Sequence, residues 1–168
     1  MIEHVGQITP EQYAEIEAGE HDPFGMDDED IEWIGKPLQT LLRRDDGALI
    51  GKVGLVLVDV EAGREAFSVA GVGGVIVTRT ERGKGHLRPL LAAALERAAE
   101  LEQERAMLFC SERNVELYER FGFAVIEAPV IAQQPSGPLV MPMPAMWRPL
   151  REGVTWPVGL VSLPGPPF

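Results

Sequence analysis

A glycine-rich stretch, Arg82-Gly83-Lys84-Gly85-His86-Leu87, stands between an apolar run and a predicted helix. Its two glycines let the backbone adopt positive φ and let another molecule approach closely. The start of a helix leaves N–H groups without partners, and these groups together with the helix dipole favour an anion. Arg82 and Lys84 add positive charge to the same stretch. The spacing therefore predicts a phosphate-binding loop at a helix N-terminus.

Two common phosphate-binding motifs do not fit this stretch. A P-loop requires Ser or Thr directly after its lysine, but Gly85 follows Lys84. The dinucleotide fingerprint G-x-G-x-x-G begins at Gly71 and fails, because Ile76 holds the place of the third glycine. Those glycines also lie inside a predicted strand rather than at its end. Neither motif explains the loop.

The loop resembles the pyrophosphate loop of the Gcn5-related N-acetyltransferase (GNAT) superfamily, which reads Q/R-x-x-G-x-G/A. The match runs from Arg82 to His86, and Leu87 replaces the usual small residue. A second motif, Tyr-Glu-Arg-Phe-Gly-Phe at residues 118–123, follows after a helix and a strand, as in that superfamily. The resemblance is close over residues 50–127, whereas the flanking segments agree only in the order of their elements.

Acetyl-CoA is the cosubstrate that this resemblance implies. Its pantetheine arm would lie along the strand before the loop, at Val75, Ile76 and Val77. Its pyrophosphate would bind the loop residues Arg82, Gly83, Lys84, Gly85, His86 and Leu87. A bulge in the strand can aim a backbone N–H at the acetyl carbonyl, as an oxyanion donor would. The alternative is a tight strand–helix turn that binds no ligand.

Tyr118 matches the position of the general acid in the superfamily. Acetyl transfer to an amine needs a neutral nitrogen and a group that protonates the departing thiolate, and a phenol has a pKa near that of a thiol. Tyr118 could instead only pack its ring or hydrogen-bond the CoA sulfur. The general base is less defined, because Gly73 and Gly74 occupy the positions where related aminoglycoside acetyltransferases often carry Glu. A water relay from the acidic N-terminal segment or from Glu112 could replace it.

Cys110 raises a second chemical possibility, a cysteine nucleophile with His86 or His21 as its base. A cysteine that ends an apolar strand is more often an inert buried thiol. No metal site is expected, because the acidic run at residues 27–30 lacks the spacing and the glycine of a calcium loop. Acetyl transfer remains the stronger interpretation.

The chain carries 26 acidic against 15 basic residues, a formal net charge of −11. This balance argues against nucleic acid as a partner, because phosphate binding needs a basic surface. In the fold that the resemblance implies, the segment before the first predicted strand forms one wall of the acceptor cleft. Its carboxylates would attract a cationic amine, and the candidate residues are Asp22, Asp27, Asp28 and Asp30. The alternative is an ordinary solvated acidic surface.

The hydrophobic pattern predicts one mixed α/β (α+β) domain, a mostly antiparallel sheet flanked by helices. The predicted strands are residues 38–44, 49–60, 67–78, 106–110 and 123–131. The predicted helices are residues 9–19, a helix that begins close to Gly85, and residues 114–121, with a further short helix considered in the acidic segment. The proline-rich tail, residues 129–168, holds ten of the 14 prolines and allows at most an edge strand at 139–146. Trp147, Trp156 and Phe168 are expected to hold this tail against the body.

We therefore expect a single domain over residues 1–168. One cysteine and an N-terminus without a basic, apolar leader favour a cytoplasmic location. No membrane span is expected, since the apolar runs are strand-sized. A homodimer is an open expectation.

The sequence predicts an acetyl-CoA-dependent N-acetyltransferase that modifies a primary amine of a small, cationic acceptor such as an aminoglycoside or a polyamine. The more specific resemblance, to aminoglycoside 2′-N-acetyltransferases, is weaker than the superfamily match. Two alternatives remain: a non-catalytic acyl-CoA-binding module, and a protein or peptide N-acetyltransferase with an open groove.

Overall fold

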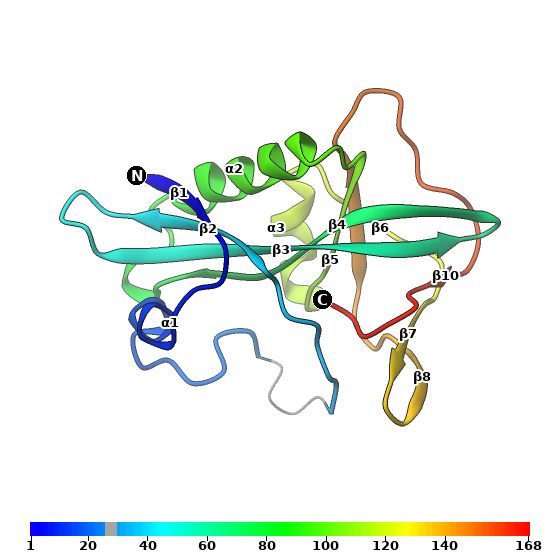
Figure 1. Cartoon of the computed structure of the whole chain (residues 1–168), viewed down its shortest axis with the longest axis horizontal. Helices are drawn as coiled ribbons and strands as arrows, with labels where there is room; N and C mark the ends of the chain where they lie inside the picture. The colour runs from blue at the N-terminus through cyan, green and yellow to red at the C-terminus, as the bar shows by residue number, and fades with distance from the viewer. Residues whose placement is uncertain (26–29) are drawn as a thin grey trace.

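Two long strands, β3 (Leu49–Ala62) and β4 (Glu65–Val77), form an antiparallel hairpin at the centre of the sheet (Figure 1). The computed structural model describes residues 1–25 and 30–168. Every residue of β3 from Leu49 to Val56 is buried, whatever face its side chain points to. Burial on both faces is expected for a strand that is covered on both sides.

The hairpin belongs to a ten-stranded mixed sheet. β2 (Leu38–Arg43) and β1 (Ile2–Val5) extend it beside the first half of β3. Beside the end of β3 lie β10 (Val161–Ser162), β7 (Val130–Gln134) and β8 (Gly137–Val140). Beyond β4 follow β5 (Arg105–Phe109), β9 (Ala145–Pro149) and β6 (Ala124–Val125). The β4–β5 and β7–β10 pairs are parallel, which brings the start of the tail next to its end.

Helices cover both faces of the sheet (Figure 1). On one face, α2 (Leu87–Glu100) packs an apolar stripe into a cluster with α3 (Val115–Glu119). On the other face, α1 (Pro10–Glu17) packs Ile16 into a separate cluster. The alternation of strand side chains explains the two clusters, since Ile76 faces α1 while its neighbour Val77 faces α2.

Local signals set the ends of the helices as predicted. Thr9 and Gln12 form a capping box at the start of α1, where Thr9 Oγ1 accepts from Gln12 N at 3.2 Å. Between β4 and α2 lie the 3₁₀ turn η1 (Arg79–Glu81) and the glycine loop. A second 3₁₀ turn, η2 (Glu112–Asn114), joins β5 to α3. Because β4 and β5 are parallel, these two connections place both sequence motifs at the carboxyl ends of the two strands.

The strand predicted over residues 123–131 is wrong. It divides into β6 and β7, with Pro129 directly before β7, where a proline lacks the N–H that a central strand needs. The edge strand predicted at 139–146 is wrong as well. Pro142 and Pro144 separate β8 from β9, and β9 lies inside the sheet between β6 and β5. The sequence patterns also miss β1, and no helix forms in residues 20–25 or 30–37 of the acidic segment.

The proline-rich tail packs against the body through aromatic side chains, as predicted. The Trp156 ring lies 5.4 Å from the Phe67 ring of β4 and 5.5 Å from Trp147, and the Phe168 ring, 2% exposed, lies 5.2 Å from Phe109. Ile34 N donates to the carbonyl of Pro167 at 2.7 Å, which ties the tail to the end of the acidic segment. The tail therefore brings Phe168 to the centre of the molecule (Figure 1). Within the described ranges, no helix is long and apolar enough to cross a membrane.

Candidate active site

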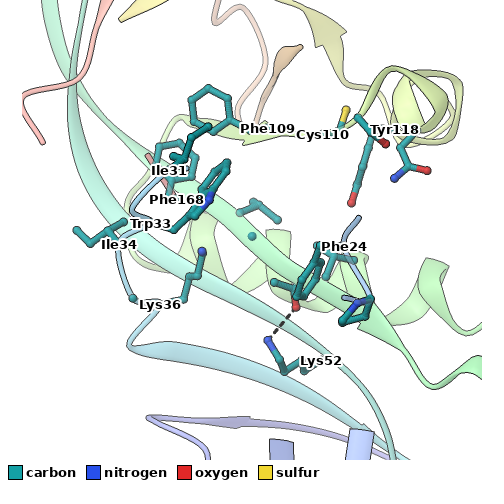
Figure 2. A pocket seen from close by; sticks show the side chains of 18 of the residues that line it. Phe24, Ile31, Trp33, Ile34, Lys36, Lys52, Phe109, Cys110, Tyr118 and Phe168 are labelled. Atoms are coloured by element: carbon teal, nitrogen blue, oxygen red, sulfur yellow. Dashed lines mark hydrogen bonds between the residues drawn. The ribbon is translucent and has the colours of Figure 1, made fainter. Parts of the chain in front are cut away.

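A cavity of about 630 Å³ opens where β4 and β5 separate (Figure 2). The two strands pair only over Ala70–Val72 and residues 106–108. From Gly73 onward, the edge of β4 that faced β5 has no strand partner in the described structure. Unpaired backbone groups of a strand edge can pair with an extended ligand. Among described residues, the further walls come from α1, residues 22–24 and 31–39, the end of β5, α3 and Phe168.

β4 carries a bulge at the mouth of this opening. Lys52 pairs with Ile76 and Gly54 with Gly73, so that Gly74 and Val75 oppose a single residue of β3. Gly74 has φ +57°, a value that L side chains rarely adopt. Val75 lines the cavity, whereas Ile76 and Val77 pack into the clusters on either side of the sheet. The side chain of Val75 thus borders the cavity that a pantetheine arm would enter.

The glycine loop presents backbone donors at the start of α2. Gly83 and Gly85 have φ of +76° and +85°, and a Cβ built at either position meets no atom within 4 Å. His86, at the N-cap of α2, makes no side-chain capping bond. The N–H groups of residues 83–87 make no hydrogen bond within the described part of the chain. Free donors and open space at a helix N-terminus fit a pyrophosphate group.

The charged side chains of the loop are paired with carboxylates. Arg82 donates to Glu20 Oε1 at 3.0 Å and to the carbonyl of Val77 at 2.9 Å. Lys84 Nζ lies 3.1 Å and His86 Nε2 3.3 Å from Glu81 Oε2. The Lys84 ammonium in particular holds the pKa of Glu81 below its usual value. The free donors of the loop are therefore its backbone N–H groups, while Leu87 begins α2.

Tyr118 projects from α3 with its hydroxyl toward the cavity (Figure 2). The ring is buried and packs edge-on against Phe123, with centroids 5.9 Å apart. The hydroxyl makes no hydrogen bond to the described chain. Burial, with a smaller effect of the Cys110 thiol, raises the pKa of Tyr118, so the phenol keeps its proton over the physiological range. Tyr118 is thus a neutral donor without a hydrogen-bond partner among residues 1–25 and 30–168.

Two lysines occupy the space beside Gly73 and Gly74, the two positions where a Glu could have served as general base and the sequence has glycine. A Cβ built on Gly73 would lie 3.1 Å from Lys36 Nζ, and one on Gly74 would lie 2.7 Å from Lys52 Nζ. Lys52 Nζ donates to the carbonyl of Gly74 at 2.9 Å, as the dashed line in Figure 2 shows. Burial lowers the pKa of Lys52 to about 8, with repulsion from Lys36 as the second cause. Burial also lowers the pKa of Lys36.

The acidic candidates do not gather around the cavity. Asp22 lines the cavity, but Asp30 and Glu112 do not. The lining residue at this end of β5 is Arg113, which follows Glu112 in the sequence. Asp27 and Asp28 lie outside the described residues. Among described residues the lining thus holds three cationic side chains, Lys36, Lys52 and Arg113, against one carboxylate.

Cys110 lies at the end of β5 in an apolar setting. Its Sγ is 3.7 Å from Met146 Sδ, and burial raises the pKa of the thiol to about 11. A protonated thiol is a poor nucleophile. Neither His86 nor His21 lines the cavity that Cys110 borders. In residues 1–25 and 30–168, no three His, Cys, Asp or Glu side chains are arranged to hold a metal ion.

Sequence reasoning missed Lys36, Lys52 and Phe168 as parts of the site. Lys52 carried a signal, since it is a lysine inside an otherwise apolar run and is 4% exposed. Lys36 and Phe168 carried none, because they reach the cavity through the fold of the N-terminal segment and of the tail. Ser111 and Gln39 also line the cavity and carry buried side-chain oxygens without a hydrogen-bond partner.

Comparisons with known proteins agree with this geometry. The model of the Acetyltransferase (GNAT) domain family matches residues 8–126. The fold is similar to that of a GNAT family N-acetyltransferase (YhbS) from Escherichia coli solved with CoA, with 20% identity, 96% of this chain and 89% of that chain covered, and a TM-score of 0.61. An acyl-CoA N-acyltransferase structure from Klebsiella pneumoniae gives 19% identity, coverage of 90% and 97%, and a TM-score of 0.64.

A third similar structure is N-acetylglutamate synthase from Neisseria gonorrhoeae with coenzyme A and N-acetyl-glutamate. It is 15% identical over 90% of this chain and 36% of that chain, with a TM-score of 0.57. A search of curated proteins found no match.

Proposed function

The chain belongs to the GNAT acetyltransferase family, whose cosubstrate is acetyl-CoA, and we propose that it acetylates a primary amine of a small molecule bound beside Tyr118. The observation that carries this proposal is the convergence of three features on one cavity. These are the unpaired edge of β4, the bulge at Gly74 and the free hydroxyl of Tyr118. The loop at residues 83–87 lies beyond the bulge, on the same connection from β4 to α2.

The chain's own residues divide the work of acetyl transfer. Bound acetyl-CoA would supply a thioester whose carbonyl an amine can attack. The free N–H groups of residues 83–87 would hold the pyrophosphate. Backbone N–H groups at the Gly74–Val75 bulge would stabilise negative charge on the carbonyl oxygen. Tyr118 would donate its hydroxyl proton toward the departing sulfur.

The raised pKa of Tyr118 refines its role. A thiol has an ordinary pKa of about 8.5, so full transfer of a proton from this phenol to a thiolate is unfavourable at rest. A hydrogen bond to the sulfur requires no such transfer, and it is strongest when the sulfur carries charge. We therefore assign Tyr118 to stabilising the departing thiolate by a hydrogen bond as the C–N bond forms and the C–S bond breaks, while the proton that the amine nitrogen loses balances the one that the sulfur gains as CoA leaves as a thiol.

The cationic side chains of the cavity reduce the need for a general base, which Gly73 and Gly74 cannot supply. A positive charge close to a bound ammonium disfavours its charged form and lowers its pKa. Lys36, Lys52 and Arg113 would therefore favour a neutral amine, the form that attacks the thioester. This effect lowers the demand on a carboxylate base at Gly73 or Gly74. The water relays from Glu112 or the acidic segment remain proposals without a contact in the described structure.

A small molecule suits the cavity better than a protein segment. The hydrogen bond from Ile34 to Pro167 joins the N-terminal segment to the tail beside the cavity, and Phe168 closes one side of it. A protein substrate would need an open groove at this place. The net charge of −11 favours a cationic acceptor at long range, whereas the described lining is mostly cationic, so the cavity itself does not support that preference.

Release of CoA thiol tests the proposal. Wild-type protein should release thiol from acetyl-CoA in proportion to the concentration of a suitable amine, and the rate should rise with pH as the amine loses its proton. The panel should include amino acids, simple amines, aminoglycosides and peptides. Tight binding of acetyl-CoA without amine-dependent release from any of them would instead support the non-catalytic acyl-CoA-binding module.

A further inference from the structure

Lys36 reaches the cavity through a path that two glycines leave open. A Cβ built on Gly54 would lie 2.7 Å from Lys36 Cβ, and one on Gly73 would lie 2.5 Å from Lys36 Cε. The aliphatic part of the side chain thus runs across β3 and β4, where any other residue would collide with it. This path delivers the ammonium to the bulged part of β4, where the acetyl group of the cosubstrate is proposed to bind.

The Lys36 ammonium makes no ion pair with a side-chain carboxylate among the described residues. Its nearest recorded interaction is with the face of Trp33, 5.9 Å from Nζ to the ring centroid. Lys52 adds a second positive charge close enough to repel it, and Arg113 a third on the lining. Desolvated ammonium groups that repel one another are costly unless an anion joins them. Asp22, which also lines the cavity, makes an interaction of its own.

Apolar side chains form the wall next to Lys36. Trp33 and Phe109 meet edge-on with ring centroids 6.1 Å apart, and Phe168 packs against Phe109. Ile31 and Ile34 continue this wall, and Figure 2 shows it across the cavity from Tyr118. An apolar wall beside a desolvated cation suits a ligand with an apolar body and one anionic group.

From this arrangement we infer that the acceptor is an amino acid or a close analogue, whose carboxylate binds Lys36 and whose apolar side chain packs against Trp33 and Phe109. This inference rests on the proposed acetyl transfer and names its substrate class. The carboxylate relieves the repulsion between Lys36 and Lys52. The amino group then lies on the side of the bulge and of Tyr118, where acetyl transfer is proposed.

Three matched acceptors test the inference: L-phenylalanine, L-phenylalaninamide and phenethylamine. They share the aromatic body and the primary amine, and only the first carries a carboxylate. Wild-type protein should acetylate phenylalanine with a kcat/KM about 10- to 100-fold above that of the other two, the range expected for a hydrogen bond to a charged group. The amide also represents a peptide N-terminus, so this preference would separate free amino acids from peptides.

Lys36→Met tests the residue, because methionine keeps an unbranched side chain and removes the charge. The variant should lower kcat/KM for phenylalanine about 10- to 100-fold more than it lowers kcat/KM for phenethylamine, which loses only the effect of the Lys36 charge on the protonation of its amine. Arg64→Met is the matched control, since it removes one positive charge from an exposed turn and should change neither value. If Lys36 serves instead to hold the tail at Phe168, the variant would lose activity toward phenylalanine and phenethylamine by the same factor, which would overturn the inference.

The outcomes separate this inference from the proposed function. Acetylation of amines with equal kcat/KM for all three compounds would contradict the carboxylate site and leave acetyl transfer standing. A preference for aminoglycosides or polyamines would contradict it as well, and would restore the cationic acceptor. No amine-dependent thiol release from any compound would contradict the proposed function itself.

Discussion

The two halves of the cavity are built in different ways. The half proposed to hold the cofactor is lined by the bulge in β4, the end of β5 and α3, and the glycine loop and α2 follow β4 outside the described lining. Its donors are backbone N–H groups. The half proposed to hold the acceptor is assembled, among described residues, from residues 22–24 and 31–39, Lys52 on β3 and Phe168, and its proposed recognition groups are side chains.

This difference has a consequence for specificity. Backbone donors at a strand edge and a helix N-terminus persist through most substitutions, so the cofactor half keeps one ligand. The acceptor half depends on which side chains two distant segments bring to β4. Among described residues, the charged side chains of its lining are mostly cationic, although the whole chain carries a net charge of −11. Net charge therefore does not predict the charge of the cavity.

Gly85→Glu should have the largest effect, and only on the cofactor half. The substitution places a side chain on a backbone with φ +85° and a carboxylate where the pyrophosphate is proposed to bind. CoA affinity should fall about 1,000-fold, because several charge-assisted hydrogen bonds are lost together. Calorimetry measures this directly. Gly47→Glu, at φ +88° in the β2–β3 turn, carries the same strain and charge and should bind CoA normally.

Tyr118→Phe should act on the chemical step and spare both binding halves. The phenol works only once negative charge develops on sulfur, so kcat should fall about 100-fold. CoA affinity from calorimetry and the acceptor KM should stay close to wild type. An unchanged kcat on an accepted amine would reduce Tyr118 to a packing residue.

Much of the cofactor half could be predicted from the sequence, because its signals are local. Glycines at a strand–helix junction and a tyrosine before Phe-Gly-Phe specify backbone geometry within a few residues. The start of α1 at Thr9 and the antiparallel pairing of β3 with β4 could be predicted from local residues in the same way. The bulge at Gly74 was expected only from the family resemblance.

The acceptor half and the tail could not be predicted in the same way. Lys36 becomes a cavity residue only because Gly54 and Gly73 lie beside each other on paired strands. Phe168 enters the site only because β10 pairs with β7 and β3. Such contacts depend on pairings between residues far apart in the chain. The two wrong strand predictions, at 123–131 and 139–146, have the same origin, since prolines divide both segments and β9 takes its place from long-range pairing.

Lys52→Met should change the pH dependence of stability through the acceptor half. The folded state lowers the pKa of Lys52 to about 8, below its unfolded value, so burying this group costs stability at neutral pH. That cost disappears as the pH rises from about 8 toward 10, because the folded state then releases its proton while the unfolded state keeps it.

Between pH 7 and pH 9.5, the free energy of unfolding of wild type relative to the Lys52→Met variant should therefore rise by about 2 kcal/mol. Urea denaturation of both proteins at the two pH values measures this difference. Because groups other than Lys36 titrate equally in both proteins, the comparison reports Lys52 together with its repulsion from Lys36. A difference that does not vary with pH would show that Lys52 is charged and compensated in the folded state.

Asp30→Asn should have the smallest effect. The side chain is exposed and absent from the described lining of the cavity, and an exposed charge contributes little at ordinary salt. KM should change less than about twofold for cationic and carboxylate-bearing amines alike. A selective rise in KM for cationic acceptors would restore the acidic segment as part of the acceptor site.

Mass spectrometry of the acceptor tests the central claim, that the cavity joins a CoA thioester to an amine, most directly. After incubation of wild-type protein with acetyl-CoA and phenylalanine, the account predicts that the amino acid gains one acetyl group on its nitrogen, and that Gly85→Glu and Tyr118→Phe slow its formation. Free acetate with unmodified amines across the whole panel, or an acetyl group that stays on the protein, would contradict the account.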